Sequence, residues 1–325
     1  MITFKRLPLT PLLLLLVALA LVLWRLQSIT DWWKLHGYTP PTAVAQLAGD
    51  DTMNAYTRHL FYLNKPQLPT TVNAFRKVCP ENLDTIVLGC YHPDQNGIYI
   101  YAVQDPTLAG IQQVTAAHEV LHSVYARLSG SARKQLNAEL RDYYEHGLTD
   151  ANVKAEVALY QKTEPDSVYD EMSCTFGTEI ADLPAALNTY YAQFFTDRQK
   201  IVGYEQQYQA QFTSRRQQIT ADDTQLAGMK AQINSEEADL TTESTGLGKQ
   251  KTQLQQLLSS GQLAAYNTGV ASYNTRVDSY NAALGNLKQQ ISNYNQLVDT
   301  RNSIAGQLTT LDGAIDTRLS TATAP

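Results

Sequence analysis

The stretch that decides the fold runs from Leu108 to Leu128 and reads LAGIQQVTAAHEVLHSVYARL. Apolar and histidine side chains recur along it at intervals of three and four residues, which is the period of a helix with one buried face; they are Ile111, Val114, His118, Leu121, His122, Tyr125 and Leu128. Two histidines on a buried face are costly unless their ring nitrogens have partners. The stretch therefore predicts a central helix that carries a site as well as a core face.

The pattern His-Glu-x-x-His occupies residues 118–122. Because the two imidazoles are four residues apart, they leave one face of the helix about one turn from each other and can bind one metal ion. Zinc at such a site lowers the pKa of a bound water and polarises a carbonyl group, while a neighbouring carboxylate moves the proton. The pattern predicts His118 and His122 as Zn²⁺ ligands and Glu119 as general base and acid. A chance occurrence, or a satisfied pair of core histidines, is the alternative.

This motif in its setting resembles the HExxH zinc metallopeptidases, the zincins, over about residues 50–195. The resemblance implies that a zinc-activated water hydrolyses peptide bonds and that the motif helix crosses beneath an active-site cleft. It also implies a strand, just before that helix, that borders the substrate. Residues 97–103 (GIYIYAV) are well placed to form this strand, and its exposed edge is expected to pair with the main chain of an extended peptide.

A catalytic zinc normally has three protein ligands and a water, so a third ligand is needed. The extended metzincin pattern fails, because Tyr125 and Leu128 occupy its glycine and third-histidine positions. The gluzincin resemblance instead implies a glutamate from a later helix; the candidates are Glu139, Glu145, Glu164, Glu171 and Glu179. Residues 131–146 predict a charged amphipathic helix with a serine cap, and the glutamates within it are expected on its solvated side.

Residues 166–179 (DSVYDEMSCTFGTE) are more typical of an active-site helix. Residues 170–174 resemble the element of gluzincin second helices in which an acidic residue and a glutamate precede small residues. The resemblance implies Glu171 as the third ligand, with Glu179 as the alternative ligand and Asp170 as the hydrogen-bond partner of a ligand histidine. A Tyr or His is expected to stabilise the oxyanion, and the sequence does not separate the candidates Tyr99, Tyr101, Tyr169 and His146.

The N-terminus carries a second signal. Residues 7–24 contain no charged side chain, a length close to the ~20 residues that cross a bilayer. Lys5 and Arg6 precede this run and favour a cytoplasmic N-terminus. No small-x-small cleavage site follows, so we expect an uncleaved single-pass signal anchor at 7–26 rather than the alternative, a cleaved signal peptide. Either way the bulk of the chain is expected outside the cytoplasm. The absence of N-x-Ser/Thr sequons favours a bacterial cell envelope.

The cysteine content and the net charge exclude several classes of protein. The chain has three cysteines, too few for a disulfide-dense scaffold or an all-cysteine zinc site. Cys79 and Cys90 flank an expected strand at 84–88 that is followed by a turn and the strand at 97–103, and an oxidising compartment would allow a disulfide between them. Two unpaired thiols are the alternative. A net charge of −6 argues against nucleic-acid binding.

The C-terminal third predicts a coiled coil. One apolar series recurs every seven residues, at Phe212, Ile219, Leu226, Ile233, Leu240, Leu247 and Leu254. After Ser259-Ser260-Gly261 a second series alternates steps of four and three, at Tyr266, Val270, Tyr273, Val277, Tyr280, Leu284, Leu287, Ile291, Tyr294 and Val298. Arms of equal length around this turn predict an antiparallel hairpin, with a parallel dimer as the alternative. Several positions of the second series are tyrosines. The hairpin could therefore bind a coiled-coil partner, self-associate or act as a plain solvated spacer, and the sequence leaves all three alternatives open.

Together these patterns predict an α+β chain that is mostly α. The expected parts are a cytoplasmic tip (1–6), the transmembrane anchor (7–26), a linker (27–50), a zincin-like metallopeptidase domain with a small sheet (51–196) and the coiled coil (197–320). The predicted function is a cell-membrane zinc metallopeptidase, a hydrolase that faces outward and acts on a peptide or protein. The alternative is a non-catalytic envelope adaptor whose coiled coil binds a partner and whose metal site is structural or degenerate.

Overall fold

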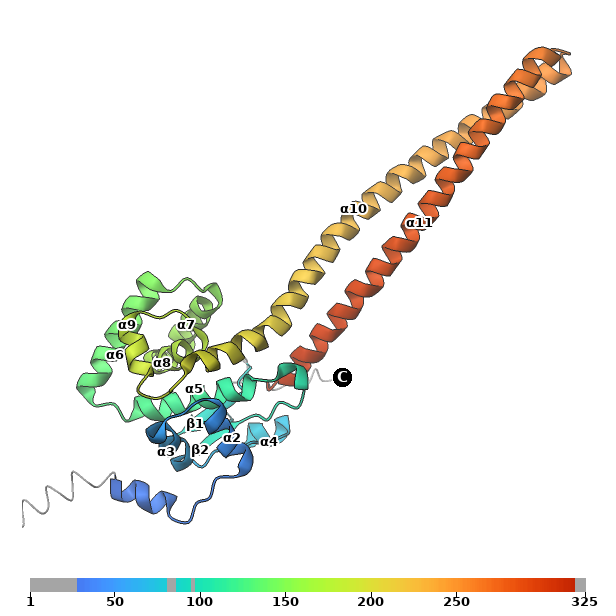
Figure 1. The fold of residues 1–325 in the computed structure, drawn as a ribbon. Coiled ribbons are helices and arrows are strands. Elements are labelled where there is room, and N and C mark those ends of the chain that lie inside the picture. Colours follow the sequence, from blue (N-terminus) through green and yellow to red (C-terminus); the bar gives the residue numbers. More distant parts are fainter. Residues whose placement is uncertain (1–27, 81–85, 95–96, 319–325) are drawn as a thin grey trace, which may run out of the picture. The chain divides into compact units, whose positions relative to one another are not determined.

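A computed structural model describes residues 28–80, 86–94 and 97–318. These residues are mostly helical, with a small two-stranded sheet and a long C-terminal helical hairpin (Figure 1). The contacts divide the chain into two compact units. One includes everything up to Gln209 together with the segment from Ala314 onward, and the other spans Ala210–Gly313.

Four helices of the first unit begin where a polar side chain accepts a free backbone N–H group of the first turn. Asn54, Thr71, Ser129 and Asp150 accept such bonds. The elements are α2 (Thr42–Asp50), α3 (Ala55–Leu63), α4 (Val72–Val78), β1 (Gly89–His92), β2 (Gly97–Ile100), η1 (Pro106–Leu108), α5 (Ile111–Ala126), α6 (Gly130–Asp142), the π-helical η2 (Tyr143–Gly147), α7 (Ala151–Thr163), α8 (Val168–Glu179) and α9 (Ala185–Tyr191).

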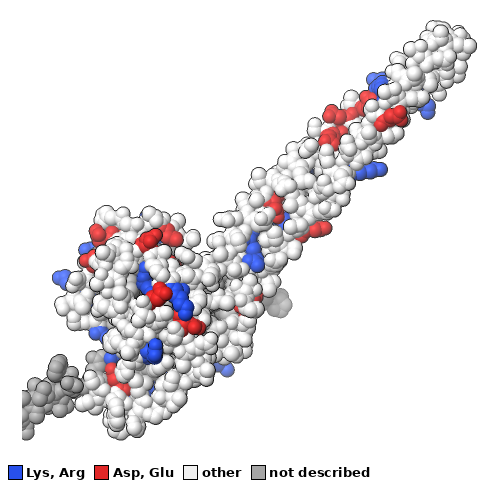
Figure 2. Space-filling view, in the orientation of Figure 1, with Lys and Arg blue, Asp and Glu red and all other residues white. Residues whose placement is uncertain are grey.

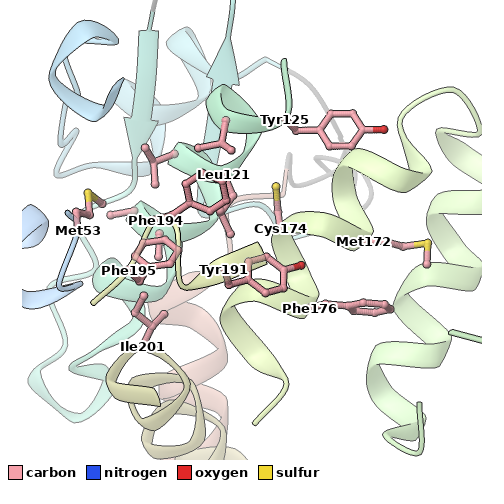
Figure 3. Packing of buried hydrophobic residues seen from close by; sticks show 14 of the residues in the cluster. Met53, Leu121, Tyr125, Met172, Cys174, Phe176, Tyr191, Phe194, Phe195 and Ile201 are labelled. Atoms are coloured by element: carbon pink, nitrogen blue, oxygen red, sulfur yellow. The ribbon is translucent and has the colours of Figure 1, made fainter. Parts of the chain in front are cut away.

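The predicted central helix is α5, which starts after Gly110 and ends at Ala126. It packs mainly against α8 and also contacts α2, α3 and both strands. Small side chains make this close approach possible: a Cβ atom added at Gly177 of α8 would overlap the Leu121 side chain. Cys174 and Tyr191 are fully buried near Leu121, and Phe176 is fully buried beside Met172 (Figure 3). The helix that carries the motif is thus the centre of the core.

The stretch 27–50, expected to be a linker, contributes to this core. Residues 28–35 are helical, and α2 follows them. Val44, Leu47 and Ala48 of α2 are buried in the main hydrophobic cluster. The expectation failed because these three apolar positions lie too close together in sequence to show a full helical period.

The observed sheet differs from the predicted one in two ways: its first strand begins later in the sequence, and a different strand carries the open edge. The described part of the expected strand 84–88, residues 86–88, is not a strand; the first strand is β1, which pairs antiparallel with β2 from Gly89↔Ile100 to His92↔Gly97. The other edge of β2 is occupied, since Ile98 and Ile100 exchange backbone bonds with Asn64 and Gln67. The expectation that residues 97–103 offer an exposed edge is therefore wrong. In the described residues β1 carries the open edge.

A disulfide joins Cys79, which ends α4, to Cys90 in β1, eleven residues later. Closing a loop of this length removes conformational freedom from the unfolded chain. Replacing both cysteines by alanine is expected to lower the free energy of unfolding by about 3 kcal/mol. Urea unfolding of the variant and the wild type, followed by circular dichroism, measures this difference. The matched control is Cys174→Ala, which removes the buried free thiol and keeps the disulfide. A reductant should lower the stability of this control as much as it lowers the stability of the wild type.

The second unit is an antiparallel helical hairpin, as predicted. It is formed by most of α10 (Arg198–Ser259) and α11 (Leu263–Ile315), which reverse direction at Gly261, a residue with φ of 75°. Ion pairs show the antiparallel arrangement. Arg276 in the first half of α11 binds Glu243 in the second half of α10, and Arg301 in the second half of α11 binds Asp223 in the first half of α10, both at 2.9 Å. Charges of both signs are scattered along the visible face, with wide uncharged areas between them (Figure 2).

The chain after the hairpin rejoins the first unit. The Thr317 hydroxyl donates to the Val87 carbonyl, and the Thr317 carbonyl accepts from Arg76. The second unit is therefore an insertion between two parts of the first.

No helix among the described residues is both long and apolar enough to cross a membrane. The predicted anchor at 7–26 and the cytoplasmic tip lie outside the described residues.

Candidate metal centre

The central site lies where α5 and α8 pack together. His118 and His122 project from successive turns of α5, with ring centroids 5.0 Å apart. Glu171 of α8 faces both: its Oε2 is 3.5 Å from His118 Nε2, and its Oε1 is 3.7 Å from His122 Nε2. The structure thus brings together the two motif histidines and the glutamate favoured as the third ligand.

These spacings fit a zinc ion. Two ligand atoms that each lie about 2.0–2.1 Å from zinc at the tetrahedral angle are about 3.4 Å apart. The separations between the carboxylate oxygens and the two Nε2 atoms are close to this value and too long for good hydrogen bonds. Two neutral imidazoles and a carboxylate are also the donor set that catalytic zinc prefers. This geometry is compatible with a metal ion held between the three side chains.

Asp170 orients one of the histidines. His122 Nδ1 donates to Asp170 Oδ1 at 2.9 Å, which turns Nε2 toward Glu171. Burial by itself lowers the pKa of His122, but the neighbouring Cys174, Asp170 and Glu171 raise it well above its usual range. Asp170 therefore occupies the supporting position expected of it.

Cys174 is also close enough to the two histidines to be considered as a ligand. Its sulfur lies 3.9 Å from Asp170 Oδ1, the atom that accepts from His122 Nδ1. Burial raises the pKa of the thiol, whereas the Glu171 carboxylate faces the Nε2 atoms of both histidines. We therefore place Cys174 in the packing around the site and keep Glu171 as the third ligand.

Glu119 is buried beside the two histidines, with 5% of its surface exposed. Its Oε2 atom has no hydrogen-bond partner among the described residues. Burial raises the pKa of this carboxyl, although the two motif histidines act in the opposite direction. A buried carboxylate oxygen without a partner is costly in a structural role and useful in a proton-transfer role.

The first strand borders the site, a feature that the sequence did not indicate. The backbone of Gly89 approaches Glu119 so closely that a Cβ atom added there would overlap the carboxylate. Tyr91, two residues further along β1, stacks on His122 with the ring planes 4° apart. Both contacts depend on how β1 packs on α5, and no local pattern of residues encodes that packing.

Glu179 lies in a different environment. It is eight residues, or about 12 Å of helix, beyond Glu171. Its pKa is raised well above the usual range by burial and by the charges of Glu156 and Glu205, which places it among carboxylates. Burial likewise raises the pKa of Glu205 to about 7. The contacts of Glu179 therefore favour a neighbouring acidic cluster over a role at the histidine pair.

Three of the four candidates for oxyanion stabilisation contact residues other than the two motif histidines and Glu171. Tyr99 contacts His92, Tyr101 contacts Phe75, and the exposed His146 binds Asp142. The half-buried Tyr169 packs against the hydrophobic core.

Tyr160 of α7 is a candidate that the sequence analysis missed. Its hydroxyl donates to Glu156 at 3.2 Å. Its pKa is raised by burial and by the charges of Glu171 and Glu156, so the phenol remains a hydrogen-bond donor beside the third ligand. It lies on a helix of its own, and nothing in its sequence neighbourhood sets it apart.

Two other features do not form this site. Cys79, Cys90 and His92 lie close together, but the two cysteines are joined as a disulfide and cannot bind a metal as thiolates. A cavity of about 800 Å³ is lined by α6, α9 and the C-terminal end of α5. His118, Glu119, His122 and Glu171 do not line it.

Comparison of the chain with protein-family models, curated proteins and solved structures gives no match.

Proposed function

We propose that this chain is a membrane-anchored, extracytoplasmic zinc metallopeptidase. The observation that carries the proposal is the convergence of two Nε2 atoms and the Glu171 carboxylate at ligand spacing, beside the buried Glu119. A purely structural zinc site is closed by its own ligands and has no need of an additional carboxylate without a partner. The presence of Glu119 therefore favours hydrolysis over a structural or degenerate metal site.

His118, His122 and Glu171 would hold the ion, and Asp170 would fix the orientation of His122. Zinc, when bound, supplies a Lewis acid that lowers the pKa of water and polarises a carbonyl. Glu119 accepts the proton of the attacking water and returns it to the leaving amine, so that the same carboxylate is base and then acid. The phenol of Tyr160 would donate a hydrogen bond to the oxygen on which charge develops once its O–H leaves Glu156.

The substrate class follows from the strand beside the site. Strand β1, whose outer edge is open among the described residues, packs against Glu119 at Gly89 and against His122 at Tyr91. An extended peptide can add to such an edge through main-chain hydrogen bonds, which places a peptide bond next to the histidines. This supports an unfolded segment of a protein, or a peptide, as substrate.

The location is supported by the sequence of residues 7–24, whose 18 uncharged positions approach the length of a bilayer span. The Cys79–Cys90 disulfide agrees with an oxidising compartment. Lys5 and Arg6 before the apolar run support a cytoplasmic N-terminus and hence a catalytic unit on the outer side of the membrane.

Metal analysis tests the proposal. Full-length protein purified with zinc in the buffer is expected to retain about one zinc ion per chain, as three protein ligands imply. It is expected to cleave an unfolded casein substrate; a chelator should abolish cleavage, and added zinc should restore it. The double variant His118→Ala, His122→Ala should lose both zinc and cleavage, while His146→Ala, an exposed histidine on the same unit, should keep both.

Two outcomes contradict the proposal. Wild-type protein that binds no zinc excludes a metal site of either kind. Protein that holds zinc but cleaves no unfolded substrate favours the adaptor, in which the metal is structural and the coiled coil binds a partner.

A further inference from the structure

The helical segment at residues 28–35 has an unusual orientation. Ile29, Trp32 and Trp33 lie within an arc of about 100° on a helix of 3.6 residues per turn, and they are 46%, 59% and 70% exposed. On the opposite side, Asp31 is only 8% exposed, and Leu35 packs against the core. A surface helix normally turns its apolar face to the core and its charges to water. Here the acid faces the protein and the indoles face outward.

This orientation is fixed by contacts with the first unit. Both carboxylate oxygens of Asp31 accept from Arg127, at 2.8 and 3.0 Å, in the two-pronged geometry that makes such pairs specific. His59 Nε2 lies 4.0 Å from the same carboxylate. The helix therefore cannot turn its indoles inward without breaking a partly buried ion pair.

Arg127 connects this segment to the metal centre. It is the residue directly after α5 and lies five residues beyond His122. The helix that exposes the indoles is thus tied to the end of the helix that carries both motif histidines.

The exposed side chains have the chemistry of a membrane interface. Indoles combine a large apolar surface with one N–H donor, and for this reason tryptophan gathers at the headgroup level of bilayers. Trp32 packs edge-on against Trp33 and also contacts His36, with ring centroids 6.0 and 4.9 Å apart. Tyr56, which is 48% exposed, adds apolar surface at the start of α3.

The sequence before this helix identifies what covers it. The uncharged run ends at Trp24, four residues before position 28. Four residues span at most about 14 Å of extended chain. If the run crosses a bilayer, as in the proposed function, then the outward face of residues 29–33 must lie close to the lipid headgroups.

We propose that Ile29, Trp32 and Trp33 insert into the interface of the lipid bilayer and that the Asp31–Arg127 pair thereby holds α5 at a set position above the membrane. This goes beyond the proposed function and rests on its membrane anchor, not on zinc or catalysis. A metal centre held in this way reaches the segments of membrane proteins next to the bilayer, and peptides that diffuse along its surface.

Tryptophan fluorescence tests this proposal directly, because the chain has three tryptophans, Trp24, Trp32 and Trp33. Full-length Trp24→Phe protein is reconstituted into vesicles of equal parts phosphatidylcholine and phosphatidylglycerol. Bromine atoms are placed on the acyl chains either near the glycerol backbone or near the chain ends. We expect blue-shifted emission, quenching several-fold stronger with the shallow bromines than with the deep ones, and weak quenching by aqueous iodide.

The matched control moves the reporter. Leu263 at the start of α11 is 59% exposed, as is Trp32. Leu263→Trp, in a chain whose three native tryptophans are replaced by Phe, should show the emission of an indole in water and full iodide quenching. The proposal is overturned if Trp32 and Trp33 behave like this control, or if the chain does not float with the vesicles. Blue-shifted emission that no bromine quenches also overturns it, since a protein partner or a second copy then covers the indoles.

Discussion

Glu119→Gln is expected to lower kcat for peptide hydrolysis by about 10²- to 10⁴-fold, the usual contribution of a positioned general base. Glutamine has nearly the same shape, so the close packing against Gly89 is kept. It cannot accept a proton from water, however. Because no described hydrogen bond joins Glu119 to the ligands, zinc content should stay at the wild-type level. Steady-state cleavage of a fluorogenic peptide and metal analysis of the same sample provide the two readouts.

The control for this change is Glu145→Gln, which alters an exposed carboxylate on the same unit and should leave both readouts unchanged. Unchanged cleavage by the Glu119 variant would remove the enzymatic interpretation altogether. Loss of zinc together with activity would instead assign Glu119 to metal binding.

Glu171→Gln is expected to weaken zinc binding by at least about 100-fold, since changes to residues that merely support ligands already cost 10- to 100-fold. The amide removes the negative charge that faces both histidines while keeping the size of the side chain. Competition with a chromophoric chelator measures the affinity. Glu179→Gln is the matched variant, because the same substitution is made eight residues later on the same helix.

We expect Glu179→Gln to bind zinc with wild-type affinity, because its neighbours are the carboxylates of Glu156 and Glu205. The reverse outcome, in which Glu179→Gln loses zinc and Glu171→Gln retains it, would show that the ion lies elsewhere along α8. Equal loss in both variants would point to a general disturbance of that helix, which circular dichroism can detect.

The parts of the fold that the sequence predicted are those with a long, regular period. The apolar and histidine positions of residues 108–128 cover about five helical turns, and α5 lies within them. The seven-residue repeat and the turn at Gly261 likewise predicted the hairpin. Periodicity over many turns is informative because chance rarely sustains it.

The failures concern short elements and tertiary neighbours. Strands of four residues carry too few positions to show alternation, so β1 was expected too early and the open edge was assigned to the wrong strand. The two helical segments between residues 28 and 50 are each only about two turns long. The roles of Tyr91 and Tyr160 beside the site arise from packing between elements, for which a sequence offers no local signal.

The insertion of the hairpin has a consequence for how the chain can vary. Since the polypeptide leaves the first unit at Gln209 and re-enters it at Ala314, both ends of the inserted segment are anchored in one folded body. Removing or adding matched heptads in the two arms would preserve the seam and leave His118, His122 and Glu171 untouched. The length of the hairpin can therefore be changed by engineering without altering the residues of the candidate metal centre.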